Sequence, residues 1–124
     1  MVAIFELLKQ LIALVMAVVS LLGIKTTSAV DVELYANPSS GYMWEYSYDK
    51  NGIVALTDEY YLPDPSAILS SGGGTQKFTF QAIGPGIVNI TFRYVDTLGK
   101  DIASTYVYTY SVDETGEIEL ISVK

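Results

Sequence analysis

The feature that most constrains this chain is an alternation of apolar and polar residues in short segments that are separated by turn-forming residues. Within these segments every second side chain is apolar or aromatic, which is the period of a β-strand with one buried face. Segments of this kind, about eight to twelve residues apart, are typical of an antiparallel β-sandwich. We therefore predict an all-β fold of seven or eight strands. The main segments are residues 30–36, 42–48, 53–57, 76–82, 87–95, 103–112 and 117–123.

Aromatic residues supply much of the predicted core. Trp44 is the only tryptophan of the chain and shares one strand face with Tyr42 and Tyr46, so we expect it to anchor the core. Residues 49–52, Asp-Lys-Asn-Gly, predict a hairpin-type turn. Residues 58–65 contain two prolines, which exclude a central strand and predict an irregular segment.

The first 29 residues are predicted to be separate from this domain. Residues 11–24 form an uncharged apolar run of the length of a signal-peptide core, and Thr27-Ser28-Ala29 offers small residues for cleavage. If the run is counted from residue 4, it approaches the length of a membrane span, so residues 4–24 could instead act as an uncleaved anchor. We expect residues 1–29 to be a signal peptide or membrane anchor. The domain of residues 30–124 is then secreted or extracytoplasmic.

Composition excludes several classes of function. The chain has no cysteine and no histidine, so no disulfide, thiol nucleophile, Ser-His-Asp triad or histidine-based metal site can form. Residues 30–124 keep five basic and 13 acidic side chains, a net charge of −8, which argues against nucleic acid and anionic membranes as partners. The acids of residues 58–64 are more simply solvated loop charges than catalytic groups. We predict that the protein is not an enzyme and needs no cofactor or metal.

The connection between the first two strands is rich in residues that fix a turn. Pro38 restricts its own φ and drives Asn37 to an extended conformation, whereas Gly41 can adopt a positive φ. The side chains of Asn37 and the two serines can bond to nearby backbone. An ordinary turn would have the same composition. The stretch comprises Asn37, Pro38, Ser39, Ser40, Gly41 and Tyr42.

Two further loops stand out downstream. Residues 72–75 are Gly72, Gly73, Gly74 and Thr75, which predict a flexible or sharply bent loop before the Phe78-Thr79-Phe80 strand. Residues 96–101 form a polar loop that begins with Asp96, Thr97 and Leu98.

With these loops in place, the chain resembles the chagasin family of proteinaceous inhibitors of papain-like cysteine proteases, in particular its exported bacterial members. The family signature Asn-Pro-Thr-Thr-Gly-aromatic corresponds to residues 37–42, with Trp44 following. The Gly-x-Gly-Gly signature corresponds, with a change of one register, to Gly72-Gly73-Gly74-Thr75. The third signature, Arg-Pro-Trp, is replaced by Asp96-Thr97-Leu98.

The resemblance implies an immunoglobulin-like sandwich whose three signature loops gather at one end and enter the protease cleft as a wedge. It implies that residues 37–42, 72–75 and 96–98 bind the protease reversibly and without covalent chemistry. We expect the chain to be a monomer. Because tryptophan and arginine often dominate interface energetics, we expect weaker inhibition, or another protease preference, than with the full signature. Introducing Arg-Pro-Trp should then raise affinity.

A second function remains open from the sequence. The scaffold could serve as an immunoglobulin-like binding or adhesion module that has lost inhibitory activity. The altered third loop favours this interpretation, and so does the row of Tyr106, Tyr108 and Tyr110 if that row is exposed. Packing within the sheet is the commoner fate of such a row.

Overall fold

The computed structural model describes residues 6–12, 14, 28–65 and 72–124. Within these described residues the domain contains seven strands and a short 3-10 turn, η1 (Pro38–Ser40). The strands are β1 (Ala29–Ala36), β2 (Tyr42–Tyr48), β3 (Val54–Pro63), β4 (Gly74–Ala82), β5 (Gly86–Asp96), β6 (Ile102–Val112) and β7 (Ile118–Val123).

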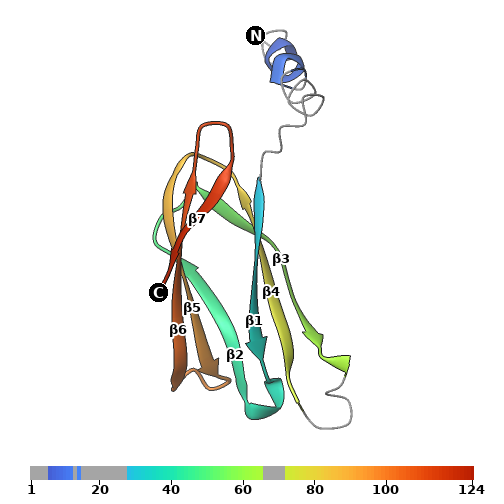
Figure 1. Ribbon diagram of the computed structural model, residues 1–124, viewed down its shortest axis with the longest axis vertical. Helices are drawn as coiled ribbons and strands as arrows, with labels where there is room; N and C mark the ends of the chain where they lie inside the picture. Colours follow the sequence, from blue (N-terminus) through green and yellow to red (C-terminus); the bar gives the residue numbers. More distant parts are fainter. Residues whose placement is uncertain (1–5, 13, 15–27, 66–71) are drawn as a thin grey trace.

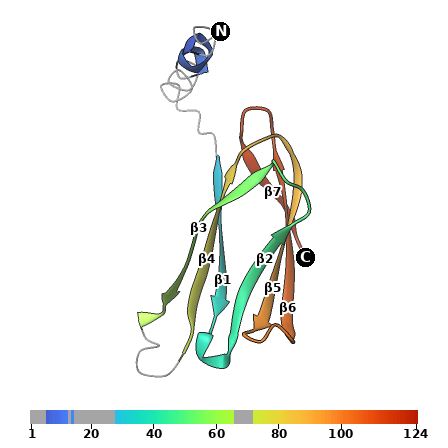
Figure 2. The same ribbon diagram turned by 180° about the vertical axis from the view of Figure 1, so that it is seen from behind.

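The strands form two antiparallel sheets that pack face to face (Figure 1). One sheet has the order β1-β4-β3, and the other has the order β2-β5-β6-β7. This is the antiparallel β-sandwich predicted from the alternation of apolar residues, with seven strands, and it has the immunoglobulin-like arrangement that the resemblance implied. Figure 2 shows from behind that β1 and β3 flank β4 in the smaller sheet.

Two local predictions were wrong. Residues 58–63 were expected to be irregular, but they continue β3 after a register shift between Leu56 and Asp58. Pro63 is tolerated because β3 lies at the edge of its sheet and ends at this residue. Residues 49–52 do not close a hairpin, because β2 and β3 belong to different sheets. The Asp49 carboxylate instead accepts hydrogen bonds from Asn89 of β5, at 2.9 Å from its backbone nitrogen and 2.8 Å from its side-chain nitrogen.

The core consists of aromatic and branched side chains from the inner faces of both sheets. Phe78 and Phe80 of β4 and Phe92 of β5 are fully buried. The rings of Phe78 and Phe92 meet across the sandwich with centroids 5.2 Å apart, and Tyr46 packs edge-on against Phe80 at 5.4 Å. Burial of each such ring contributes roughly 1.5–3 kcal/mol to folding. The expected role of alternate positions in β4 and β5 is therefore confirmed.

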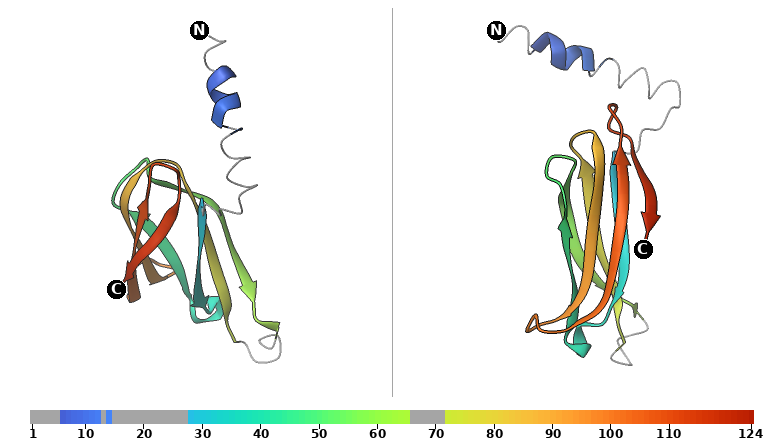
Figure 3. Two further views of the ribbon diagram at one scale, coloured as in Figure 1. Left: turned by 45° about the horizontal axis from the view of Figure 1, so that its top comes forward. Right: turned by 90° about the vertical axis from the view of Figure 1, so that its left-hand side faces the viewer.

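The connections alternate between the two ends of the sandwich. The β1–β2 turn, the end of β3 with the start of β4, and the β5–β6 loop all lie at one end (lower end in Figure 1). The β2–β3, β4–β5 and β6–β7 connections lie at the other end, and both views in Figure 3 agree with this arrangement. The three stretches singled out in the sequence thus share one end, which we call the loop end.

Most of the predicted export or anchor segment, residues 1–29, falls outside the described residues. Of this segment, residues 6–12 are helical, and Ala29 already begins β1. Among the residues that the structure describes, no helix is both long and apolar enough to cross a membrane.

Candidate functional site

The first stretch of the loop end is a single 3-10 turn with both of its ends capped. The Asn37 Oδ1 atom accepts hydrogen bonds from the backbone nitrogen of Ser39 at 3.2 Å and from its hydroxyl at 2.6 Å. The hydroxyl of Ser40 donates to the Asn37 carbonyl at 2.5 Å. Pro38 occupies the first helical position, and Gly41 ends the turn with φ +84°, a conformation that L side chains rarely adopt. The turn is therefore fixed by its own residues.

Tyr94 of β5 is hydrogen-bonded to the start of this turn. The backbone N–H of Asn37 donates a hydrogen bond to the Tyr94 hydroxyl at 2.8 Å. The Tyr94 ring stacks on Tyr42, with centroids 5.4 Å apart, and packs against Trp44 at 4.9 Å. Tyr94 thus joins β5 to the turn through its hydroxyl and to β2 through its ring, and so sets the position of the turn.

The first and third loops are bonded to one another. The backbone N–H of Thr97 donates to the carbonyl of Gly41 at 2.8 Å. The Tyr42 hydroxyl donates to a carboxylate oxygen of Asp101 at 2.5 Å, and this bond raises the pKa of Tyr42 above its usual value. Because Tyr42 is itself at the start of β2, these two hydrogen bonds join the loops to one another and to the sheet that carries them.

The third loop has its own internal support. One oxygen of the Asp96 carboxylate accepts hydrogen bonds from the backbone N–H of Lys100 at 2.7 Å and from that of Asp101 at 3.4 Å. The backbone N–H of Gly99 donates to the Asp96 carbonyl at 2.9 Å. Leu98 projects from this loop with 76% of its surface exposed. Asp96 therefore shapes the loop, and Leu98 is the large apolar side chain that it presents.

The glycine stretch is only partly a loop, which corrects the sequence prediction. Gly74 and Thr75 belong to β4 and pair with Ala36 and Tyr35 of β1. A Cβ atom on Gly73 would lie 2.3 Å from the Ala36 carbonyl oxygen, and one on Gly74 would lie 2.2 Å from the carbonyl oxygen of a β3 residue. Both distances are far inside contact range, so these glycines allow neighbouring backbones to approach. Gly72 is exposed at the start of the described segment.

A buried glutamine links the two sheets behind the loops. The side-chain oxygen of Gln76 in β4 accepts a hydrogen bond from the backbone N–H of Trp44 at 2.9 Å. The side-chain nitrogen of Gln76 donates to the backbone carbonyl of Trp44, also at 2.9 Å. The indole N–H of Trp44 donates to the Tyr35 carbonyl at 2.7 Å. The prediction that Trp44 anchors the core is confirmed, and these bonds tie it to the other sheet near the loop end.

Three residues that position the loops were not identified from the sequence. Tyr94, Asp101 and Gln76 reach partners 57, 59 and 32 residues away, respectively. Tyr94 lies on the predicted core face of its strand, and Gln76 is a polar residue on an otherwise apolar face. That mismatch of Gln76 with its face was the one signal available.

The described residues of the loop end form an exposed contact surface. Within residues 6–12, 14, 28–65 and 72–124, no three acidic side chains come close enough to hold a metal ion. The row of Tyr106, Tyr108 and Tyr110 runs from exposed to buried: Tyr106 is 41% exposed although its ring stacks on Trp44 at 5.5 Å, Tyr108 is half-buried, and Tyr110 is buried. Only the Tyr106 end of the row that favoured an adhesion module is therefore exposed.

Comparison with known proteins agrees with this geometry. The model of the "Chagasin family peptidase inhibitor I42" matches residues 24–112 of the 124-residue chain. Among solved structures, the chain is similar to the cysteine protease inhibitor EhICP2 from Entamoeba histolytica, with a TM-score of 0.54 and 19% sequence identity. That similarity covers 65% of this chain and 73% of the other, and it concerns the fold. A search of curated proteins gave no match. The match over most of its length shows that this chain belongs to the chagasin family of peptidase inhibitors and is not an enzyme.

Proposed function

We propose that this protein is a reversible, non-covalent inhibitor of papain-like cysteine proteases. In this proposal residues 37–42, 72–75 and 96–98 enter the active-site cleft, and the 3-10 turn of residues 37–41 lies over the catalytic cysteine. The observation that carries the proposal is the fastening of this turn: its caps, the Tyr94 bond and the Thr97 bond all hold an exposed turn in one shape.

Preorganisation explains why such a turn suits inhibition. Fixing the backbone of one residue costs roughly 1–2 kcal/mol of conformational entropy. A turn that is already fixed in the free protein does not lose this free energy again on binding. Membership of the family supplies the class of partner, and the similar Entamoeba histolytica protein is a cysteine protease inhibitor. The uncharged run of residues 11–24 supports a site of action outside the cytoplasm.

The third loop is proposed to contribute through Leu98 alone. Asp96 and Thr97 hold the loop and its link to Gly41, so replacing all three residues by Arg-Pro-Trp would also remove the Thr97 N–H and the Asp96 carboxylate. We therefore expect Leu98→Trp to strengthen inhibition, because it adds an aromatic anchor and leaves both bonds intact. Thr97→Pro should weaken inhibition, since proline has no N–H to donate to the Gly41 carbonyl.

Titration of papain with the purified protein tests the proposal. A fragment of residues 28–124 is suitable because the buried core lies between Val32 and Ile118, and because Ser28 still supplies the carbonyl that accepts from Ala82. We expect inhibition that increases with inhibitor concentration, is relieved by dilution, and leaves the inhibitor uncleaved. Full protease activity at micromolar inhibitor, across several papain-like proteases, would overturn the proposal.

A further inference from the structure

A groove on the outer face of the β1-β4-β3 sheet opens beside the loop end. It has a volume of about 520 Å³ and is lined by Glu33 and Tyr35 of β1, Leu62 and Pro63 of β3, and Thr75 of β4, among others. The strand register sets Tyr35, Thr75 and Leu62 in one row across the sheet. Tyr35 is two residues before Asn37, so this row runs directly into the proposed inhibitory turn.

The row carries an apolar surface in an exposed position. The Tyr35 side chain is 67% exposed and that of Leu62 is 61% exposed. Exposed apolar side chains that adjoin one another and line a hollow are a common mark of an interaction site. The Tyr35 ring lies close over Gly73, because a Cβ atom at Gly73 would be 2.7 Å from the end of the ring.

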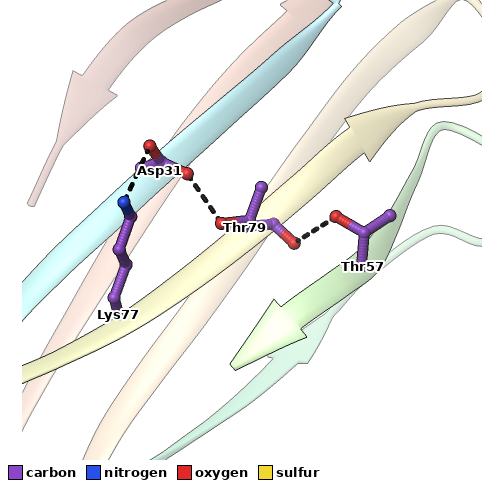
Figure 4. A network of polar contacts seen from close by, with 4 residues as sticks. All are labelled: Asp31, Thr57, Lys77 and Thr79. Carbon is purple, nitrogen blue, oxygen red and sulfur yellow. Dashed lines mark hydrogen bonds and ion pairs between the residues drawn. The ribbon is translucent and has the colours of Figure 1, made fainter. Parts of the chain in front are cut away.

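The carboxylates on the outer face of this sheet differ in whether they are paired with a cation. Further along β1, Asp31 is engaged: its carboxylate accepts from the Thr79 hydroxyl at 2.7 Å and lies 3.4 Å from the Lys77 ammonium (Figure 4). The Thr79 hydroxyl bond, followed by Lys77, lowers the pKa of Asp31. Lys77 also lies 5.8 Å from the centroid of the Tyr60 ring. The sheet therefore already holds one cation between a carboxylate and a tyrosine ring.

Glu33 and Tyr35 repeat this pairing of a carboxylate with a tyrosine ring near the loop end, and none of the described cations lies between them. Lys77 is the register partner of Glu33, but its ammonium pairs with Asp31 instead. Among the described residues, Glu33 has no hydrogen-bond or ion-pair partner. A carboxylate, an exposed aromatic face and apolar walls together suit a basic side chain with an apolar stem.

We propose that this groove takes an arginine or lysine side chain from the rim of the target protease, beside the active-site cleft. Arginine fits best, because its planar guanidinium can stack on Tyr35 while it donates to Glu33. The inference rests on the proposed inhibitory function. It makes Glu33 and Tyr35 determinants of which proteases are bound, and it extends the contact from the three loops onto the face of the smaller sheet.

The test compares inhibition constants over a panel of papain-like proteases, papain included, whose cleft rims differ in their number of arginine and lysine residues. Glu33→Gln and Tyr35→Leu should each weaken inhibition about three- to tenfold, only for proteases with a basic rim. The effect of Glu33→Gln should shrink at high salt, since screening weakens exposed charge pairs. Tyr35→Phe keeps the ring and should retain inhibition. Glu119→Gln makes the same charge change on β7 and should have no effect.

The outcomes separate the two proposals. If the wild-type chain inhibits and neither Glu33→Gln nor Tyr35→Leu changes any inhibition constant more than Glu119→Gln does, the groove is not a protease contact and the inhibitory function stands. If the wild-type chain inhibits no protease of the panel, the proposed function fails, and the groove as a protease contact fails with it. Chemical unfolding of each variant identifies any loss that comes from instability.

Discussion

Two glycines at opposite ends of the sandwich allow a matched test of the proposed inhibitory turn. Gly41 ends the 3-10 turn with φ +84°, and Gly52 lies in the β2–β3 connection with φ +88°. An added Cβ atom would meet nothing within 4 Å at either position. Alanine at either site therefore introduces backbone strain without a steric clash, and only Gly41 lies at the loop end.

Because the two glycines have similar φ angles and open surroundings, similar losses of stability are expected at both. An L residue held in the left-handed region costs roughly 1–2 kcal/mol, so Gly41→Ala and Gly52→Ala should lower the free energy of unfolding by similar amounts. For a domain of this size, each kcal/mol lowers Tm by about 4–8 °C. If distortion of the turn relieves the strain at Gly41, the turn must return to its wild-type shape in order to bind. A cost of about 1.4 kcal/mol for that return would weaken inhibition by Gly41→Ala roughly tenfold. Gly52→Ala should leave inhibition unchanged.

Gly41→Asn separates the effect of backbone strain on inhibition from the effect of an added side chain. Asparagine tolerates the left-handed region better than other side chains, so this variant should stay close to wild-type stability. Its side chain would still stand where the backbone is proposed to approach the protease, and inhibition should be lost. Thermal unfolding and titration of papain measure both quantities. Wild-type inhibition by both Gly41 variants would refute the assignment of this turn to the protease cleft.

Three further predictions concern the groups that support the loops. Tyr94→Phe removes the acceptor for the Asn37 N–H but keeps the ring. We expect it to lower the free energy of unfolding by about 1 kcal/mol and to weaken inhibition. Tyr46→Phe, measured in parallel, should leave inhibition intact. Gln76→Leu leaves two backbone groups of β2 without partners and should cost about 2–4 kcal/mol in urea unfolding; a cost below about 1 kcal/mol would mean that water replaces the amide. Burial raises the pKa of Tyr110 to about 12, so the folded state keeps a proton that the unfolded state loses above its pKa near 10. Stability should therefore be intact below pH 10 and fall as the pH rises toward 12, by at most about 1.4 kcal/mol per pH unit from this group. Tyr110→Phe should flatten that slope, and an unchanged slope would contradict the assignment.

The architecture could be predicted because each strand carries its own burial pattern. Alternate positions of β5, for example Val88, Ile90 and Phe92, are fully buried, as the period of two requires. Residues 49–52 show the limit of such reasoning. The same turn-forming residues can close a hairpin or carry the chain to another sheet, and here they cross to the other sheet while Asp49 bonds to Asn89 of β5. That contact is invisible to local pattern.

The candidate site divides in a similar way. The shape of residues 37–41 follows from local chemistry, since Asn37, Pro38 and Gly41 each act on their own neighbourhood. The fastening of that turn does not, because Tyr94 and Thr97 are distant in the sequence and contribute through a hydroxyl and a backbone N–H. The start of β4 was mistaken for a loop because glycines that permit close backbone approach look the same as glycines that permit bending.

The direction of β1 has a practical consequence for how this protein meets other molecules. The strand enters the sandwich at Ala29, at the end opposite the loops, and delivers the chain to Asn37 eight residues later. At about 3.3 Å per residue, this separates the point of entry from the turn by roughly 25 Å. Any tether on the N-terminal side of the domain, whether a natural anchor or a tag on a sensor surface, therefore leaves the loops pointing outward. Immobilisation by the N-terminus should preserve access of a large protease to them.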